Sequence, residues 1–350
     1  MERPKLAITM GDVAGIGPEV IARAFQSGQL EQNCRPLVVG HPDVLDRAIH
    51  LAGSTATVLT VENPADWLTA AEISPGSIAC WNPTNDDAAA VPAGRLDRRA
   101  GQSAYEYLVA AAQAAIEGDV DALTTAPLNK AALKLAGFDY PGHTEILADR
   151  CGCVTFAMML YLPPGPAVVS VYGFGVVHVT LHTSIRSVPE LLSEQAVAEK
   201  IELMERFLDD IGCAAPRIGV CALNPHAGEA GLFGDEEQQV IAPAVAAALS
   251  SGMNASGPLP ADTLLKRAVD GEFDGVVAMY HDQGHIALKL IGFDQAVNVT
   301  LGLPIVRTSP SHGTAFDIAW KGRARADGML AAVRVASRLA QQRRSNRVAS

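Results

Sequence analysis

The chain has 350 residues, a length typical of two domains, and 49% of them are hydrophobic, enough for a sizeable core. A formal net charge of −11 without any basic block argues against non-specific binding of nucleic acid or of an anionic membrane surface. The six cysteines form no CxxC pair, the amino terminus has no signal-peptide core, and no apolar run reaches the ~20 residues of a membrane span, so we expect reduced thiols and a cytoplasmic protein.

The first part of the chain alternates short apolar runs with helical patterns. PKLAIT and PLVVGH read as strands, with GDVAGIGPEV and a helical IARAFQ between them. The pattern up to Pro92 is mixed. Residues 101–118 then carry apolar side chains at helical spacing and end on glycine, and DALTTAP follows as a buried strand.

The rest of the chain continues this alternation. Strands are predicted over residues 154–162, 167–182, 217–225 and 274–281, and an extended segment over 295–309. Helices are predicted over residues 194–212, 240–252 and 326–344. Because strands that alternate with helices form mostly parallel sheets covered on both faces, the predicted fold class is α/β.

Histidines follow three of the predicted strands. His182, His226 and His281 stand at strand ends, where ligands of parallel sheets bind. Three neutral imidazoles would form an open site for zinc or another divalent metal. His178 shares a strand face with His182 but would lie about 13 Å away at ~3.3 Å per residue, so His182 is the better candidate. Taken singly, a histidine at a strand end is more often a hydrogen-bonding loop residue than a metal ligand.

Charged side chains near these strands need partners. Lys289 and Arg307 lie in apolar surroundings, with Asn298 between them. Their partner is either an internal carboxylate or a phosphate or carboxylate of a substrate. The carboxylates of Asp282 and Glu229 could orient the imidazoles or simply cap turns.

Two loops have the composition of ligand loops without a complete fingerprint. GDVAGIGPEV lacks the GxGxxG spacing of dinucleotide-binding turns, and a tight strand-to-helix turn is the more ordinary interpretation. SHGTAFDIAWKG interleaves His312 and Asp317 with small residues and, taken alone, reads as a capped turn.

Taken together and in order, these segments resemble a known family. GDVAGIGPEV, TTAPLNK, YPGHTE, LNPHAGEAGLFGDEE, GPLPADT, AMYHDQGH, NVTLGLPIVRTS and HGTAFDIA are similar to the motifs of the 4-hydroxythreonine-4-phosphate dehydrogenase family, from about Leu6 to about Gly322. The resemblance implies an isocitrate/isopropylmalate dehydrogenase-like fold of two α/β domains with a cleft between them, and a homodimer whose site is shared across the interface. It places a cofactor-side domain at residues 1–128 plus 262–350 and a dimerisation and metal/substrate domain at residues 129–261.

The resemblance also implies roles for particular residues. It makes His182, His226 and His281 the ligands of one divalent metal (Zn, Mg or Co), with His281 coming from the other subunit. The implied substrate contacts are His143, Thr144, Lys289, Asn298 and Arg307, the last three including those that hold a phosphate. NAD or NADP would bind at His312, Gly313 and Asp317, although Trp320 stands where glycine is usual.

The implied reaction is NAD(P)-dependent oxidation of the C3 hydroxyl of a four-carbon, 4-phosphorylated acid, with decarboxylation of the β-keto product, as in pyridoxine biosynthesis. The substrate is either 4-hydroxythreonine 4-phosphate or a 4-phosphorylated sugar acid such as D-threonate or D-erythronate, whose enzymes VHVTLH resembles more. The general base is Lys130 or Asp262, and Asp262 could instead be a helix N-cap, its commoner role. A metal-dependent phosphohydrolase is the rival from another class, and a non-catalytic metal- or ligand-binding protein is a third.

Overall fold

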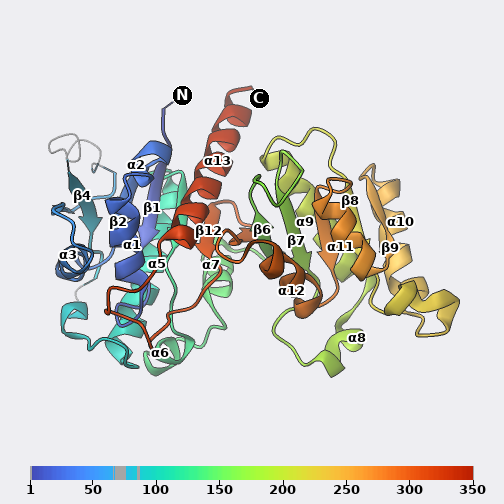
Figure 1. Ribbon diagram of the computed structural model, residues 1–350, viewed down its shortest axis with the longest axis horizontal. Helices are drawn as coiled ribbons and strands as arrows, with labels where there is room; N and C mark the ends of the chain where they lie inside the picture. Colours follow the sequence, from blue (N-terminus) through green and yellow to red (C-terminus); the bar gives the residue numbers. More distant parts are fainter. Residues whose placement is uncertain (1, 66, 68–75, 85–86, 350) are drawn as a thin grey trace. The chain divides into compact units, whose positions relative to one another are not determined.

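The computed structural model describes residues 2–65, 67, 76–84 and 87–349, which form two compact α/β units (Figure 1). Unit 1 comprises Met1–Val154 with Leu303–Ser350, and unit 2 comprises Thr155–Gly302. The predicted α/β fold class is confirmed. The expected domains, residues 1–128 plus 262–350 and residues 129–261, stay predictions together with the roles expected for them.

Unit 1 is built on a parallel sheet with the strand order β3-β4-β2-β1-β5-β12. Its strands are β1 (Lys5–Thr9), β2 (Arg35–Val39), β3 (Thr57–Val61), β4 (Ser77–Trp81), β5 (Ala122–Thr125) and β12 (Val306–Pro310). Its described helices are α1 (Gly17–Gln26), α2 (Leu30–Asn33), α3 (Pro42–Leu51), α5 (Arg98–Glu117), α6 (Lys130–Leu135), α7 (His143–Cys151) and α13 (Asp327–Ala349), with a short turn η1 (Ala88–Ala90).

The central strands of unit 1 are buried because helices cover the sheet. Strand β5 has four buried residues in a row, as expected for a parallel strand whose two faces are both covered. Helix α13 packs on β5 and β12, and α5 packs on β1 and β5 (Figure 1). Helix α5 ends at Gly118, whose φ of 86° is the left-handed conformation that favours glycine.

Unit 2 has a mixed sheet with the strand order β11-β6-β7-β10-β8-β9, in which β6 runs antiparallel to both of its neighbours. The strands are β6 (Ala157–Leu162), β7 (Phe174–His178), β8 (Ile218–Cys221), β9 (Ala255–Leu259), β10 (Gly275–Ala278) and β11 (Val297–Leu301). The helices are α8 (Val188–Leu191), α9 (Glu194–Asp210), α10 (Ala242–Ser250), α11 (Ala261–Val269) and α12 (His281–Gly292), with short turns η2 (Ile185–Ser187), η3 (Pro225–Gly231) and η4 (Glu237–Ile241).

Strand β7 and helix α12 pack closely together on one face of the unit 2 sheet. Phe174 and Val176 belong to the apolar core that also contains side chains of α11 and α12. Side chains alternate along a strand, so His178 lies on the same face as these two residues. A Cβ added at Gly284 of α12 would lie 2.5 Å from His178 Nε2, which shows how closely the helix approaches the strand.

The structure corrects two expectations about strand ends. The strand expected over 167–182 is confined to β7, so His182 lies four residues beyond its end and does not share a straight strand face with His178. The strand expected over 274–281 ends at Ala278, and His281 is instead the first residue of α12, a helix that was not predicted. Among the described residues, no helix is both long and apolar enough to cross a bilayer.

Candidate functional site

Four imidazoles gather beyond the carboxyl ends of β7 and β10 in unit 2. The His281 ring stacks on the His285 ring, one helical turn away, with 3.8 Å between their centres. His285 Nδ1 lies 3.2 Å from His178 Nε2. The His182 ring centre lies 6.1 Å from that of His281. The His281 ring centre is also 6.3 Å from that of His178, so His281 is the member of the group that adjoins each of the others.

The geometry of His281 suits a metal ligand. Its Nδ1 lies 2.7 Å from Asp282 Oδ1, which fixes the ring and leaves Nε2 for another partner. Ligation at about 2.1 Å places two imidazole centres on one ion roughly 5–6 Å apart, so the separation of His182 and His281 is close to that of a shared ion. The donor chemistry of this pair thus fits a divalent metal.

The two inner histidines of the group are held neutral. Burial, followed by the neighbouring charges of His281 and Lys289, lowers the pKa of His285 to about 4. Burial and the adjacent His285 lower the pKa of His178 well below 6.5. Both imidazoles therefore carry no charge at neutral pH.

His226 lies in a different environment. It is exposed on η3, and its ring centre is 6.4 Å from that of Phe233. Across residues 2–65, 67, 76–84 and 87–349, no group of three or more His, Cys, Asp or Glu side chains is arranged to hold a metal. One chain thus brings His182 and His281 together without His226, and the metal role of all three stays a prediction.

Gln283, which the sequence did not single out, ties together the strands that precede His226 and His281. Its Oε1 accepts the N–H of Met279 at 2.7 Å, and its Nε2 donates to the Ala222 carbonyl at 2.7 Å. Met279 follows β10 and Ala222 follows β8. The two strand ends are therefore held at a fixed separation.

A second group of expected site residues lies in unit 1 around Arg307. This side chain is only 3% exposed on β12, and its Nε and Nη2 donate to Thr125 Oγ1 at 3.2 and 2.6 Å. Burial lowers the pKa of Arg307 to about 9, opposed by the carboxylate of Glu145. The guanidinium stays charged at neutral pH, and a bound anion would offset the cost of burying it.

His143 begins α7 near this guanidinium. Its Nε2 lies 3.2 Å from the Ala126 carbonyl oxygen, and burial together with the charge of Arg307 lowers its pKa well below 6.5. Thr144 follows it and is half-buried. A neutral imidazole with a hydrogen-bonded ring is suited to contacting a substrate oxygen rather than to carrying charge.

The two candidate bases are both exposed. Lys130 begins α6 after Asn129, whose Oδ1 accepts two backbone N–H groups at the helix start. Asp262 lies in the first turn of α11 and accepts the N–H of Thr263 at 2.9 Å, while the N-cap position belongs to Pro260. The helix N-cap expected as the alternative for Asp262 is therefore not what this side chain does.

The remaining substrate candidates, Lys289 and Asn298, lie in unit 2. Lys289 is in the last turn of α12, with Nζ 6.0 Å from the ring centre of Phe293. Asn298 is half-buried on β11, opposite Leu160 of β6.

The loop expected to bind the cofactor packs on the glycine-containing turn that follows β1. Ile16 N–H donates to the Thr314 carbonyl at 3.0 Å, and Trp320 Nε1 donates to the Val13 carbonyl at 2.9 Å. A Cβ at Gly15 would lie 2.9 Å from Thr314 Cβ, so only glycine allows this approach. Trp320, the departure from the family pattern, thus fastens the two loops together.

Gly313 leaves space for a polar ligand on this loop. His312 Nε2 is buried with no hydrogen-bond partner in the described part of the chain. Open space surrounds the position where Gly313 would carry a Cβ, and Asp317 is exposed. His312 Nε2 lies against α13, 3.6 Å from where a Cβ at Gly328 would be, so the open space at Gly313 and the exposed carboxylate of Asp317 are the features that fit a hydroxyl-rich ligand such as NAD or NADP.

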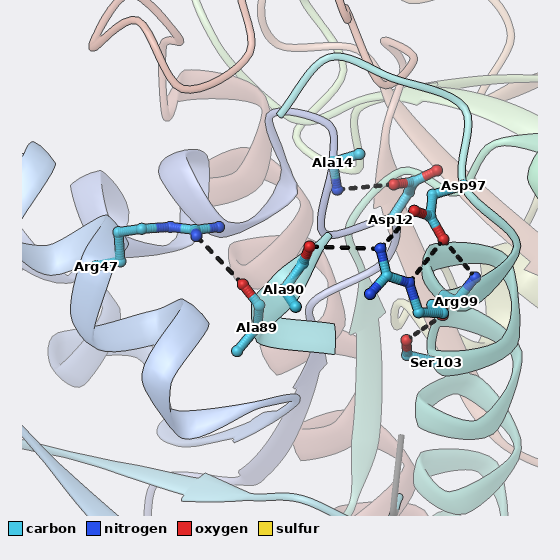
Figure 2. A network of polar contacts seen from close by, with 8 residues as sticks. All are labelled: Asp12, Ala14, Arg47, Ala89, Ala90, Asp97, Arg99 and Ser103. Atoms are coloured by element: carbon cyan, nitrogen blue, oxygen red, sulfur yellow. Dashed lines mark hydrogen bonds and ion pairs between the residues drawn. The ribbon is translucent and has the colours of Figure 1, made fainter. Parts of the chain in front are cut away.

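Asp12, in the turn after β1, is a buried acid that sequence reasoning missed (Figure 2). Its Oδ1 accepts the N–H of Ala14 at 2.8 Å, while Oδ2 has no partner among the residues that the structure describes. Nearby Asp97 caps α5 and pairs with the Arg99 guanidinium. Burial, and more weakly the charge of Asp97, raises the pKa of Asp12 to about 6. The sequence did contain a signal for this residue, namely a single acid among the small and apolar residues of GDVAGIG.

Comparison with known proteins gives the class. The chain is 45% identical over 339 residues to the 4-hydroxythreonine-4-phosphate dehydrogenase of Geobacter metallireducens, covering 97% of this chain and 96% of that one. It is 44% identical over 342 residues to the D-threonate 4-phosphate dehydrogenase of Salmonella typhimurium, covering 97% and 100%. A crystal structure of 4-hydroxythreonine-4-phosphate dehydrogenase from Klebsiella pneumoniae matches with a TM-score of 0.84 and 42% identity, covering 97% and 100%. The chain is an α/β enzyme of the dehydrogenase class.

The family follows from a second comparison. The model of the family described as "Pyridoxal phosphate biosynthetic protein PdxA" matches residues 32–336. The chain belongs to this family, which confirms the resemblance drawn from its motifs.

Proposed function

We propose that this enzyme oxidises the C3 hydroxyl of a four-carbon, 4-phosphorylated acid with NAD or NADP, depends on a divalent metal, and forms a β-keto acid that loses its carboxylate. Similarity along 97% of the chain to dehydrogenases named for such substrates supports the substrate class. The structural observation that carries the proposal is Arg307, a charged guanidinium buried beside Thr125 and His143. The isocitrate/isopropylmalate dehydrogenase-like domain arrangement is part of the same proposal.

We assign each group of candidate residues a separate role in this reaction. Lys289, Asn298 and Arg307 hold the phosphate and so fix C3 relative to the cofactor. His143 and Thr144 contact the substrate, and Lys130 or Asp262 removes the hydroxyl proton. A divalent ion at the metal-ligand histidines His182, His226 and His281 would lower the pKa of that hydroxyl and polarise the new carbonyl. NAD or NADP, held by His312, Gly313 and Asp317, would accept the hydride.

Two substrate types remain candidates because relatives of both names are almost equally similar. The Geobacter enzyme is 45% identical and the Salmonella enzyme 44%. The VHVTLH segment, which contains His178, resembles the sugar-acid enzymes and therefore favours a D-threonate or D-erythronate 4-phosphate. A panel of the three phosphorylated acids with NAD and NADP, and with Zn, Mg or Co, separates these options. Phosphate release without any cofactor would point to the phosphohydrolase instead.

Replacing Arg307 with alanine tests whether its buried guanidinium binds the substrate phosphate. We expect the KM for the phosphorylated substrate to rise by about 100-fold or more, because losing one member of a buried charge pair costs about 2–5 kcal/mol. The KM for the cofactor should change little. Turnover of the same acid without its phosphate is the control and should not depend on Arg307. Equal increases in both KM values would remove Arg307 from the phosphate site.

A further inference from the structure

His226 lies in an unusual stretch of backbone. Residues 226–230 have φ angles of 53°, 54°, 79°, 46° and 55°, so five consecutive residues are left-handed. Of these only Gly228 lacks the Cβ that makes this conformation unfavourable. Such a turn persists only where its surroundings hold it, and strained segments of this kind gather at functional sites.

A buried carboxylate holds the base of this turn. Glu237, the first residue of η4, is 3% exposed. Its Oε1 accepts the backbone N–H groups of Leu223 at 2.8 Å and of Asn224 at 2.7 Å. Its Oε2 accepts from Asn224 Nδ2 at 3.0 Å. One side chain therefore fixes the two residues through which the chain leaves β8 and enters the left-handed turn.

The turn also closes over this carboxylate from its other side. A Cβ at Gly228 would lie 2.7 Å from Glu237 Oε2, and one at Gly234 would lie 2.5 Å from Asn224 Nδ2. Glycine at both positions lets the loop pass directly against the hydrogen-bonded pair. The loop that carries His226 therefore encloses Glu237. The three hydrogen bonds of this carboxylate all go to Leu223 and Asn224, where that loop begins.

We propose that Glu237 is a positioning residue for His226: by holding Leu223 and Asn224, it keeps the left-handed turn in the conformation that presents the imidazole to the metal. This rests on the proposed role of His226 as a metal ligand. Residues that orient metal ligands from behind typically contribute 10–100-fold to metal affinity. The same range is expected here, because loss of the carboxylate leaves the turn free to relax.

Asp274, the residue before β10, provides a matched control because it binds the chain at the opposite end of β8. It is also a buried carboxylate, 2% exposed, and it accepts the backbone N–H of Arg217 at 3.1 Å just before β8. Asp274→Asn should therefore weaken the sheet of unit 2 without affecting the residues that follow β8. A loss of metal affinity that came only from general destabilisation would be seen in this variant too.

The experiment combines two measurements on Glu237→Ala, Glu237→Gln, Asp274→Asn and His226→Ala. Hydrogen exchange on the metal-free protein follows the amides of Leu223 and Asn224, and titration with zinc followed by calorimetry gives the metal affinity. Glu237→Ala should speed exchange of both amides at least tenfold and weaken zinc binding by about 10–100-fold. Glu237→Gln should have a smaller effect, because its Oε1 still accepts from the backbone while its NH2 opposes Asn224 Nδ2. Asp274→Asn should match the wild type in both measurements.

Each contrary outcome identifies what is wrong. Unchanged exchange in Glu237→Ala would mean that the carboxylate does not hold the turn. Faster exchange with wild-type zinc affinity would mean that holding the turn does not position a ligand. If His226→Ala and the wild type bind zinc equally, the proposed metal role of His226 fails and the positioning role fails with it, while the exchange data still report on the turn. Should Glu237→Ala not fold, Glu237→Gln and Glu237→Asp supply the comparison.

Discussion

Asp12 illustrates at the residue scale how burial changes the chemistry of a side chain. Its carboxyl is fully buried and has one oxygen satisfied by Ala14. The charged form is therefore disfavoured, and its pKa is raised from 3.8 to about 6. The folded state consequently holds this proton more tightly than the unfolded chain does.

This shift makes stability depend on pH in a defined direction. The contribution of Asp12 is most favourable below pH 3.8 and is lost as the pH rises through about 6. A difference of about two pKa units corresponds to roughly 3 kcal/mol in the free energy of unfolding. Asp12→Asn should remove this loss and raise the stability at pH 7.5 by about 1–3 kcal/mol, measured by urea unfolding at a series of pH values.

Asp97→Asn is the contrasting variant. Hydrogen bonds from Arg99 lower the pKa of Asp97, so its contribution is present above the unfolded pKa and is lost as the pH falls. This variant should be less stable than the wild type at pH 7.5. A destabilised Asp12→Asn variant at the same pH would show that the Asp12 carboxylate has a partner that offsets its burial.

At the scale of elements, α5 and α6 meet at a point where only glycine fits. A Cβ at Gly101 would overlap the backbone carbonyl oxygen of Ala132, which has no freedom to move aside. Alanine gains about 1 kcal/mol of helix propensity over glycine, but steric overlap in a packed contact costs about 1–3 kcal/mol or more. We therefore expect Gly101→Ala to lower the free energy of unfolding by about 1–2 kcal/mol, measured by urea denaturation.

The control for this contact is Gln113→Ala, at an exposed position of the same helix. Its effect should stay within about 0.5 kcal/mol of the wild type. If Gly101→Ala proved more stable than the wild type, propensity rather than packing would decide this position. Because α6 begins at Lys130, displacement of α6 would also move one of the two candidate bases.

Sequence patterns predicted most elements well, and their failures have physical causes. Short apolar runs located β1 and β5 closely, and helical patterns located α9 and α13. Helix α12 was missed because it begins with polar HDQGH, a composition typical of a loop, and contains Gly284. The strand predicted to reach His182 was too long. Apolar and β-branched residues continue beyond the end of β7 into a bend, and in the sequence they look like more of the strand.

The candidate site was predictable in its residue types more than in its contacts. Histidines at strand ends and an arginine in an apolar strand stand out in a sequence. The bonds of Glu237 to Leu223 and Asn224 join residues 14 and 13 positions apart, which no local periodicity reveals. The buried neutral pair His178 and His285 likewise depends on a helix that was not predicted.

At the scale of the whole molecule, we propose a homodimer with a shared site. Helix α12 and the residue that follows it expose three large apolar side chains, Ile286, Leu290 and Phe293, at 56%, 83% and 58%. Exposed apolar side chains gathered along one segment of this kind are typical of a protein–protein contact. Within one chain, however, His281 already lies beside His182, so sharing of the metal site needs a direct test.

Mixing inactive subunits provides that test. His226→Ala and His281→Ala homodimers should both be inactive, whereas subunit exchange should restore roughly a quarter of the wild-type activity, since half of the dimers become mixed and each has one intact site. Exchange is verified separately with differently tagged subunits. No recovery after verified exchange would place all three histidines of a site in one chain.

The contact between Gly284 and His178 couples two positions that are distant in the sequence. Any side chain at 284 would collide with the imidazole at 178, so the larger of the two residues sets the size of the other. Among relatives we therefore expect these positions to vary together, with bulk at 284 appearing only where 178 has become small.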